Sequence, residues 1–224
     1  MSVFHRLVQQ SASARQGFIE MPLIQEVLRE GASKELYLDF LSQAYHHVKC
    51  TAPLLGLAGS RCGSDDQKYQ AALFEYLNEE RGHEEWILED IGALGGDPKS
   101  VRQSFPRFPC KVMVGHAYYL VDRVSPYALL GMIHVLEGMA VALAANVVHT
   151  IRKAIPTASD AGFKYLMTHS ELDVEHTKFF EKLIDEIDSR HQAVVIEAAC
   201  DFYRLYGDIF RELDIRRRAA CHAS

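Results

Sequence analysis

The most concentrated set of chemically capable side chains lies in the segment Thr168 to His176, which contains His169, Asp173 and His176. On an α-helix each residue turns by about 100°, so these three side chains fall within roughly 60° of one another. Two imidazoles and one carboxylate suit iron, manganese or zinc, and the stripe contains no thiol. Three-residue patterns also arise by chance, so an ordinary polar helix face is an equal alternative for this motif alone.

A lone carboxylate, Glu137, interrupts the most apolar segment of the chain, residues 125–154. An ionised carboxylate buried without a partner costs many kcal/mol, so it needs a proton, a cation or a metal ion. An ion pair is the ordinary explanation, but that segment offers only Arg152 and Lys153, about four turns away. We therefore expect Glu137 to be a metal ligand.

A third segment places Glu80 and His83 in a Glu-x-x-His pattern, the spacing used in di-iron carboxylate bundles. Glu79 is a rival for the same position. Other acidic residues nearby, such as Glu84 and Glu85, leave an exposed acidic patch as the alternative. Taken together, the three segments supply three histidines and three carboxylates, enough for two metal ions with open positions: Glu80, His83, Glu137, His169, Asp173 and His176.

The elements that must position these residues are all expected to be helices, because no useful segment alternates with the period of a strand. We predict an all-α fold, a single helical bundle and one domain over residues 1–224. About seven principal helices are expected, at residues 21–29, 33–59, 66–94, 111–122, 125–154, 157–184 and 191–213. Residues 2–13 show a weaker helical stripe.

Two residues fall inside these expected helices and disfavour helical continuity. Pro53 is expected to kink the helix over 33–59. Gly82 costs about 1 kcal/mol relative to alanine in the middle of the helix over 66–94, so it predicts a bend or a close approach. Candidate pocket-lining residues are Tyr118, Tyr119, Met132, Met139 and Phe163, with ordinary core packing as the alternative. His46 and His47 are candidates for supporting a metal ligand or contacting the substrate, and an ordinary core or surface position is the alternative for one of them.

Composition narrows the function classes. The chain has 224 residues, of which 48% are hydrophobic and 24% charged, and the formal net charge of −6 gives no reason to expect nucleic acid. Five scattered cysteines disfavour a zinc ribbon or a disulfide framework, which fits a reducing cytoplasm. The sequence shows no signal-peptide pattern, and no apolar run is expected to reach the roughly 20 residues that span a bilayer, so we expect no membrane partner.

The order of the three motifs resembles that of the haem-oxygenase-like di-iron oxidases, which share a wider fold with haem oxygenase, the TenA thiaminases and the PqqC quinone synthase. The resemblance extends over about residues 35–210 and rests on three segments: Tyr45-His46-His47-Val48, Glu79-Glu80-Arg81-Gly82-His83-Glu84-Glu85-Trp86 and Leu172-Asp173-Val174-Glu175-His176. The chain departs from the family in having Tyr76, not a carboxylate, two turns before His83.

The resemblance implies a non-haem centre of two Fe(II) ions, with manganese as the alternative metal, that uses O2 as co-substrate and an external electron donor. It implies catalytic roles for the carboxylates of Glu80, Glu137 and Asp173. It also implies a small organic substrate, amino-acid-like or fatty-acid-like, and a homodimer is the expectation at the level of the fold.

Other readings remain open. A metal-free TenA-type thiaminase would need a cysteine nucleophile near mid-chain, but none occurs between Cys110 and Cys200. A PqqC-like oxidase uses O2 without a metal and would leave the histidine and aspartate motif unexplained. A haem oxygenase would need an axial histidine near the N-terminus, where His5 is the candidate. A metal-binding or partner protein without enzymatic activity is the fourth alternative.

Overall fold

The computed structural model describes the backbone of residues 1–155 and 161–223, and the side chains of the same residues except 169–177 and 221–223. In this described part the chain forms helices and no strand, as the sequence predicts. The α-helices are α1 (Val3–Gln10), α2 (Ala12–Ile19), α3 (Pro22–Glu30), α4 (Lys34–Val48), α5 (Thr51–Arg61), α6 (Gln67–Glu80), α7 (His83–Ala93), α8 (Pro98–Gln103), α9 (Phe108–Tyr119), α10 (Leu129–Ala154), α11 (Lys164–Asp185) and α12 (Ser189–Ala223). Shorter helical turns cover Ser64–Asp66, Leu120–Val124 and Pro126–Ala128.

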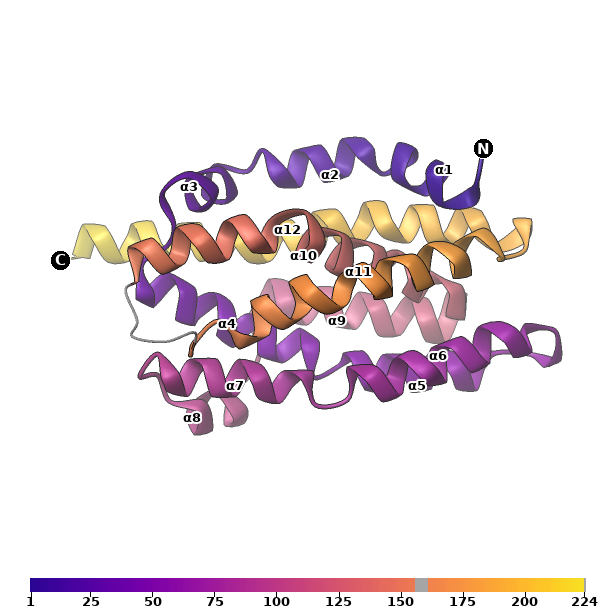
Figure 1. Cartoon of the computed structure of the whole chain (residues 1–224), viewed down its shortest axis with the longest axis horizontal. Helices are drawn as coiled ribbons and strands as arrows, with labels where there is room; N and C mark the ends of the chain where they lie inside the picture. The colour runs from indigo at the N-terminus through magenta and orange to yellow at the C-terminus, as the bar shows by residue number, and fades with distance from the viewer. Residues whose placement is uncertain (156–160, 224) are drawn as a thin grey trace.

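The helix α10 is the centre of the bundle, and it packs against α11, α12 and α3 (Figure 1). A close crossing with α12 occurs at Gly131, where a Cβ atom would lie 2.6 Å from the Cβ of Ala198. Only a glycine allows this approach, which fixes α10 against α12. Glu137 lies less than two turns further along α10, so the crossing helps to fix its depth in the bundle.

The apolar character of α10 also corrects one sequence expectation. Pro126–Ala154 is long and apolar enough to cross a membrane by length and composition, whereas no run near that length was expected. Of its most apolar window of 18 residues, 56% is buried in the bundle. A core helix passes the same test, so this one helix is weak evidence for a membrane span.

Two of the expected long helices are each divided. The helix expected over 33–59 ends at Val48, and α5 begins at Thr51, so Pro53 lies in the first turn of a new helix, where proline is tolerated, and not at a kink. The helix expected over 66–94 is divided between Glu80 and His83. Figure 1 shows α6 and α7 following one another along one side of the bundle.

The bounds of two other helices also differ. The helix expected over 111–122 begins earlier, at Phe108, with Pro109 in its first turn. The final helix does not end near residue 213 but continues to Ala223, where Arg217 forms ion pairs with Glu26 and Asp214. These ion pairs hold Arg217, the middle residue of the basic run Arg216-Arg217-Arg218, against α3 and its own helix.

Candidate metal centre and cavity

The break between α6 and α7 brings Glu80 and His83 together. Gly82 has a φ of +94°, in the left-handed region that glycine adopts without strain, and it ends α6 directly after Glu80 and Arg81. The chain then begins α7 at His83, whose Nδ1 lies 3.3 Å from Oε2 of Glu80. The two side chains therefore meet across a helix break, not on one continuous helix as their spacing predicted.

Both side chains are buried, and each is 4% exposed. Oε1 of Glu80 is also buried and has no hydrogen-bond partner among the described residues. The rival carboxylate, Glu79, is exposed. A buried carboxylate oxygen without a hydrogen bond is costly unless a cation completes it, so the geometry favours Glu80 over Glu79 as a ligand. The ligand role itself stays a prediction.

Glu137 reaches the same region from α10. Its Oε1 accepts a hydrogen bond from the hydroxyl of Tyr76 at 2.7 Å, and no lysine or arginine of the described residues forms an ion pair with it. Tyr76 lies one turn before Glu80 on α6, so both residues project from one face of that helix. The structure thus brings Glu80, His83 and Glu137 into one neighbourhood, and Tyr76 orients one of the two carboxylates.

The remaining predicted ligands, His169, Asp173 and His176, lie outside the described side chains. Their backbone belongs to α11, which packs against α10 and α7, the helices that carry Glu137 and His83. Among the side chains that the structure describes, no group of three or more histidine, cysteine, aspartate or glutamate residues is arranged to hold a metal ion. Glu80, His83 and Glu137 are therefore the described half of the predicted six-residue set.

The N-terminus of α11 is fixed to α7 by a buried carboxylate. Asp90 is 1% exposed, and its two oxygens accept hydrogen bonds from the backbone nitrogens of Lys164 at 2.9 Å and Tyr165 at 2.8 Å. Burial raises the pKa of Asp90, while the hydrogen bonds from these amides lower it, and the net shift is upward. The carboxylate fixes where α11 begins relative to His83.

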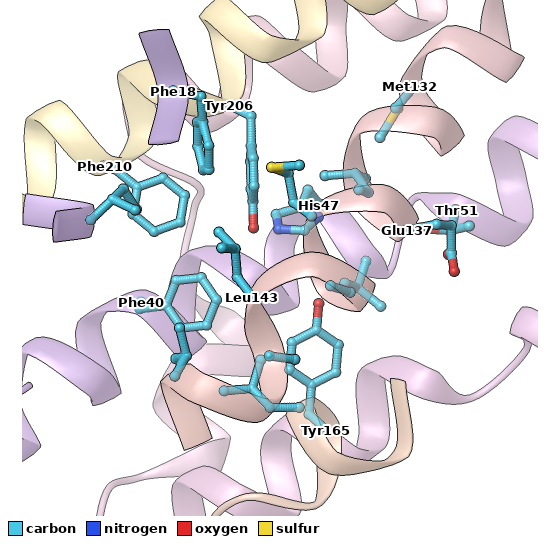
Figure 2. A pocket seen from close by; sticks show the side chains of 18 of the residues that line it. Phe18, Phe40, His47, Thr51, Met132, Glu137, Leu143, Tyr165, Tyr206 and Phe210 are labelled. Carbon is cyan, nitrogen blue, oxygen red and sulfur yellow. The ribbon is translucent and has the colours of Figure 1, made fainter. Parts of the chain in front are cut away.

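A cavity of about 160 Å³ adjoins the two predicted carboxylate ligands. Glu80, Glu137 and Tyr76 line it at one end, and the aromatic rings of Phe18, Phe40 and Phe210 line it elsewhere. Figure 2 shows Glu137 with Thr51 on one side of the cavity and these three phenylalanines on the opposite side, with His47 and Tyr206 between them. The described residues that line it include no lysine and no arginine. The cavity is therefore apolar, with its acidic groups confined to one end.

The structure tests the pocket residues named from the sequence. Met132, Met139 and His47 line the cavity. Phe163 is instead fully buried against Tyr37, Tyr119 is 57% exposed on α9, and neither Tyr118 nor His46 lines the cavity. The Nε2 atom of His46 instead lies 2.9 Å from the hydroxyl of Ser104.

Several cavity residues escaped the sequence analysis. Tyr76 was noted only as a departure from the family pattern, and Tyr206 and Thr51 were not identified. Tyr206 lies in a helical apolar stripe with Phe202 and Phe210, which has the pattern of any core-facing helix. The sequence pattern of such a stripe does not distinguish a tyrosine whose hydroxyl points into a cavity from one that is packed in the core.

Comparison with protein families identifies residues 38–207 as matching the model of a family described as iron-containing redox enzyme. No curated protein sequence matches the chain significantly.

Solved structures share the fold. A domain of unknown function with a haem oxygenase-like fold from Shewanella denitrificans is 23% identical with a TM-score of 0.88, and the match covers 99% of this chain and 96% of that one. A TenA homologue from Pseudomonas syringae is 14% identical with a TM-score of 0.78, covering 95% and 92%. Haem oxygenase-2 from Synechocystis, solved with haem and NO, is 13% identical with a TM-score of 0.78, covering 98% and 88%. These matches confirm the predicted all-α, haem-oxygenase-like fold.

Proposed function

The chain belongs to the family of iron-containing redox enzymes, and on that premise we propose that it is an O2-dependent oxidoreductase with a non-haem dinuclear iron centre. The proposed ligands are those expected from the sequence: Glu80, His83, Glu137, His169, Asp173 and His176. When bound, the two iron ions would supply the redox chemistry and the activation of O2, with electrons from an external donor.

The observation that carries this proposal is the state of Glu80. Its Oε1 is buried without a hydrogen-bond partner among the described residues, beside an imidazole and in the lining of a cavity. Carboxylate oxygen and imidazole nitrogen are donors that suit iron, and a cation would offset the cost of burying the charge. The described residues therefore fit the group that the family implies.

The chain's own residues would position the reacting groups. The hydroxyl of Tyr76 holds Oε1 of Glu137 and so restricts rotation of that carboxylate. Partners of this kind, which hydrogen-bond to a metal ligand, orient it and raise the affinity of a site. Because Glu80 and Glu137 line the cavity, a substrate in the cavity would lie directly beside the ligands.

The cavity favours a substrate with an apolar body. An amino acid would bring a charged ammonium and a charged carboxylate, but the described lining offers no lysine or arginine and keeps its two glutamates at one end. Burying a charge without a partner is costly. Of the two substrate classes implied by the resemblance, a fatty-acid-like molecule fits better, with its polar group at the metal end and its apolar part toward Phe18, Phe40 and Phe210.

The alternative functions have less support. His5, the candidate axial ligand for a haem, is exposed on α1 and does not line the cavity. Among the described residues, no cysteine lines the cavity either. Cys110 is fully buried, and burial raises its pKa to about 12, which keeps the thiol protonated and unreactive.

Iron analysis of four proteins tests the proposal: the wild type, Glu80→Gln, His169→Ala and the control Glu79→Gln. After anaerobic loading with ferrous iron and removal of the excess, we expect about two irons per wild-type chain. Glu80→Gln and His169→Ala should each lose iron from at least one site. The exposed Glu79 has the same chemistry one residue away, so its variant should keep the wild-type iron content.

Other results of this iron analysis would contradict the proposed ligands or the proposed metal centre. Unchanged iron in Glu80→Gln with loss in Glu79→Gln would transfer the ligand role to Glu79. A wild-type protein that binds haem would contradict the non-haem centre, and one that binds no iron and hydrolyses thiamine would support the TenA-type alternative.

A further inference from the structure

One of the polar groups that line the cavity and have no role in the proposed metal centre is the hydroxyl of Tyr206. In Figure 2 this hydroxyl points into the space between His47 and Leu143, away from the backbone of its own helix, α12. It makes no hydrogen bond with any of the described residues. A phenolic hydroxyl in an apolar setting normally has a partner, because burying it without one costs free energy.

The ring of Tyr206 is held in place by three other rings. It stacks on Phe18 with a centroid distance of 5.3 Å and an interplanar angle of 10°. Phe210 and His47 meet it nearly at right angles, at 5.1 and 5.8 Å. Such contacts restrict the ring, so the direction of the hydroxyl is set before any ligand binds. A donor that is already oriented loses little entropy on binding.

The hydroxyl stays protonated under ordinary conditions, because burial raises the pKa of Tyr206 well above its usual value. It can therefore donate a hydrogen bond as well as accept one. Around it the lining is apolar: Phe18, Phe40, Leu143 and Phe210 are neighbours in the cavity that offer no acceptor from their side chains. Since it makes no hydrogen bond with any of the described residues, including the adjacent ring of His47, this hydroxyl is available to a ligand bound in the cavity.

We infer that Tyr206 donates a hydrogen bond to an oxygen atom carried within the apolar body of the substrate. The ligand class is a medium-length apolar compound with an internal ketone, ether or hydroxyl oxygen, in addition to the polar group at the Glu80 and Glu137 end. The inference rests on the proposed function and adds to it a second polar contact for the substrate. It takes from that function only the orientation of the substrate, with its first polar group at Glu80 and Glu137.

The volume of the cavity limits the size of the compounds that can be used to test this inference. Its volume of about 160 Å³ is close to that of an engineered cavity of roughly 150 Å³ that holds benzene. Compounds of about eight carbon atoms are a reasonable upper length. The probes should also be neutral, because without a metal ion Glu80 and Glu137 would repel a carboxylate. Octan-1-ol and the isomeric hydroxyoctanones, which add one ketone at each internal position in turn, meet both conditions.

Calorimetric titration of the metal-free protein with this series tests the inference. In the wild type, one hydroxyoctanone should bind about tenfold more tightly than octan-1-ol, the usual effect of one good hydrogen bond in an apolar site. In Tyr206→Phe, which keeps the ring and removes only the hydroxyl, that advantage should vanish while octan-1-ol binds as before. The iron content of Tyr206→Phe should equal that of the wild type.

Thr51→Val is the matched control, because it removes a different cavity hydroxyl, which Figure 2 shows on the Glu137 side of the cavity and apart from Tyr206. It should change the binding of both probes alike and keep the tenfold ratio. The inference is overturned if no hydroxyoctanone binds better than octan-1-ol, if no probe binds, or if Tyr206→Phe keeps the ratio. Since the titration needs no iron, failure of the metal centre and failure of this contact give different results.

Discussion

Two buried carboxylates lie ten residues apart on consecutive helices, and their surroundings are opposite. Asp90 on α7 is 1% exposed and accepts hydrogen bonds from the first backbone nitrogens of α11 through both of its oxygens. Glu80 on α6 is 4% exposed, lies beside His83 and has one oxygen with no hydrogen-bond partner among the described residues. Burial alone therefore does not distinguish a structural acid from a functional one.

The difference lies in what compensates each charge. Asp90 receives its compensation from the protein, because the N-terminus of a helix presents unpaired N–H groups and the positive end of the helix dipole. Among the described residues Glu80 has no such donors, and it lines a cavity, so a bound cation is the compensation that we propose for it. The first arrangement stabilises the fold. The second leaves an unfavourable desolvation free energy that a bound metal ion can offset.

The strongest test of this comparison is the stability of the metal-free protein after each carboxylate is removed. Asp90→Ala leaves at least two partly buried N–H groups of α11 without acceptors, so the free energy of unfolding should fall by about 4 kcal/mol. Glu80→Gln removes a buried charge and keeps the volume, so the change should stay within about 1 kcal/mol. Urea denaturation followed by circular dichroism measures both.

A matched control separates the effect of burying a carboxylate from the effect of capping a helix. Asp97 caps α8 through the same kind of hydrogen bonds, to the nitrogens of Lys99 and Ser100, but it is exposed. Asp97→Ala should cost only about 1 kcal/mol. If Glu80→Gln proved as destabilising as Asp90→Ala, Glu80 would be a structural acid and the contrast would fail.

The fold itself was largely predictable from sequence, because the helical periodicity of the apolar residues is strong along most of the chain. The two divisions that the sequence missed have local causes. At Gly82 the chain adopts a left-handed conformation, which a glycine permits but does not require. Between Val48 and Thr51 the helix stops at Lys49 and Cys50, neither of which is a typical stop signal.

The site was less predictable than the fold. Glu137 stands out because its helix is otherwise so apolar, whereas Glu80 and Glu79 differ only in burial, which depends on the fold. Asp90 looked like one more acid in an acidic segment, since its partners lie more than seventy positions away at the start of α11. Contacts of this kind depend on how helices meet, and no single-sequence pattern records that.

A smaller effect extends the comparison to histidines. His134 on α10 is 8% exposed among the rings of Phe4, Phe180 and Tyr203, and burial lowers its pKa from 6.5 to about 4. In the unfolded chain it takes up a proton near pH 6.5, while the folded protein resists until about pH 4. Stability should therefore be retained above pH 6.5 and fall by about 3 kcal/mol as the pH drops to 4.

The variant His134→Phe removes this titration, so its loss of stability between pH 6.5 and pH 4 should be about 3 kcal/mol smaller than that of the wild type. The comparison is between pH values within each protein, so a packing change that is independent of pH cancels. His46, whose pKa burial also lowers to about 4, is present in both proteins. The exposed His5, changed to glutamine, is the control and should leave the pH dependence as it is. An unaltered profile in His134→Phe would mean that this histidine titrates alike in the folded and unfolded chain.

The smallest expected effect concerns Gly82, the residue that separates Glu80 from the helix that carries Asp90. Its φ of +94° disfavours a side chain, yet a Cβ atom there would meet nothing within 4 Å, so only the backbone opposes substitution. Gly82→Ala should therefore cost about 1 kcal/mol. Gly115 also has open space around it but lies inside α9, so Gly115→Ala should stabilise the protein by up to about 1 kcal/mol. Both values come from urea denaturation of the metal-free proteins. If Gly82→Ala also stabilised the protein, α6 and α7 would be able to join into the continuous helix that the sequence predicts. Glu80 and His83 would then meet on one helix face, and the break would not be what separates Glu80, the proposed metal ligand, from Asp90.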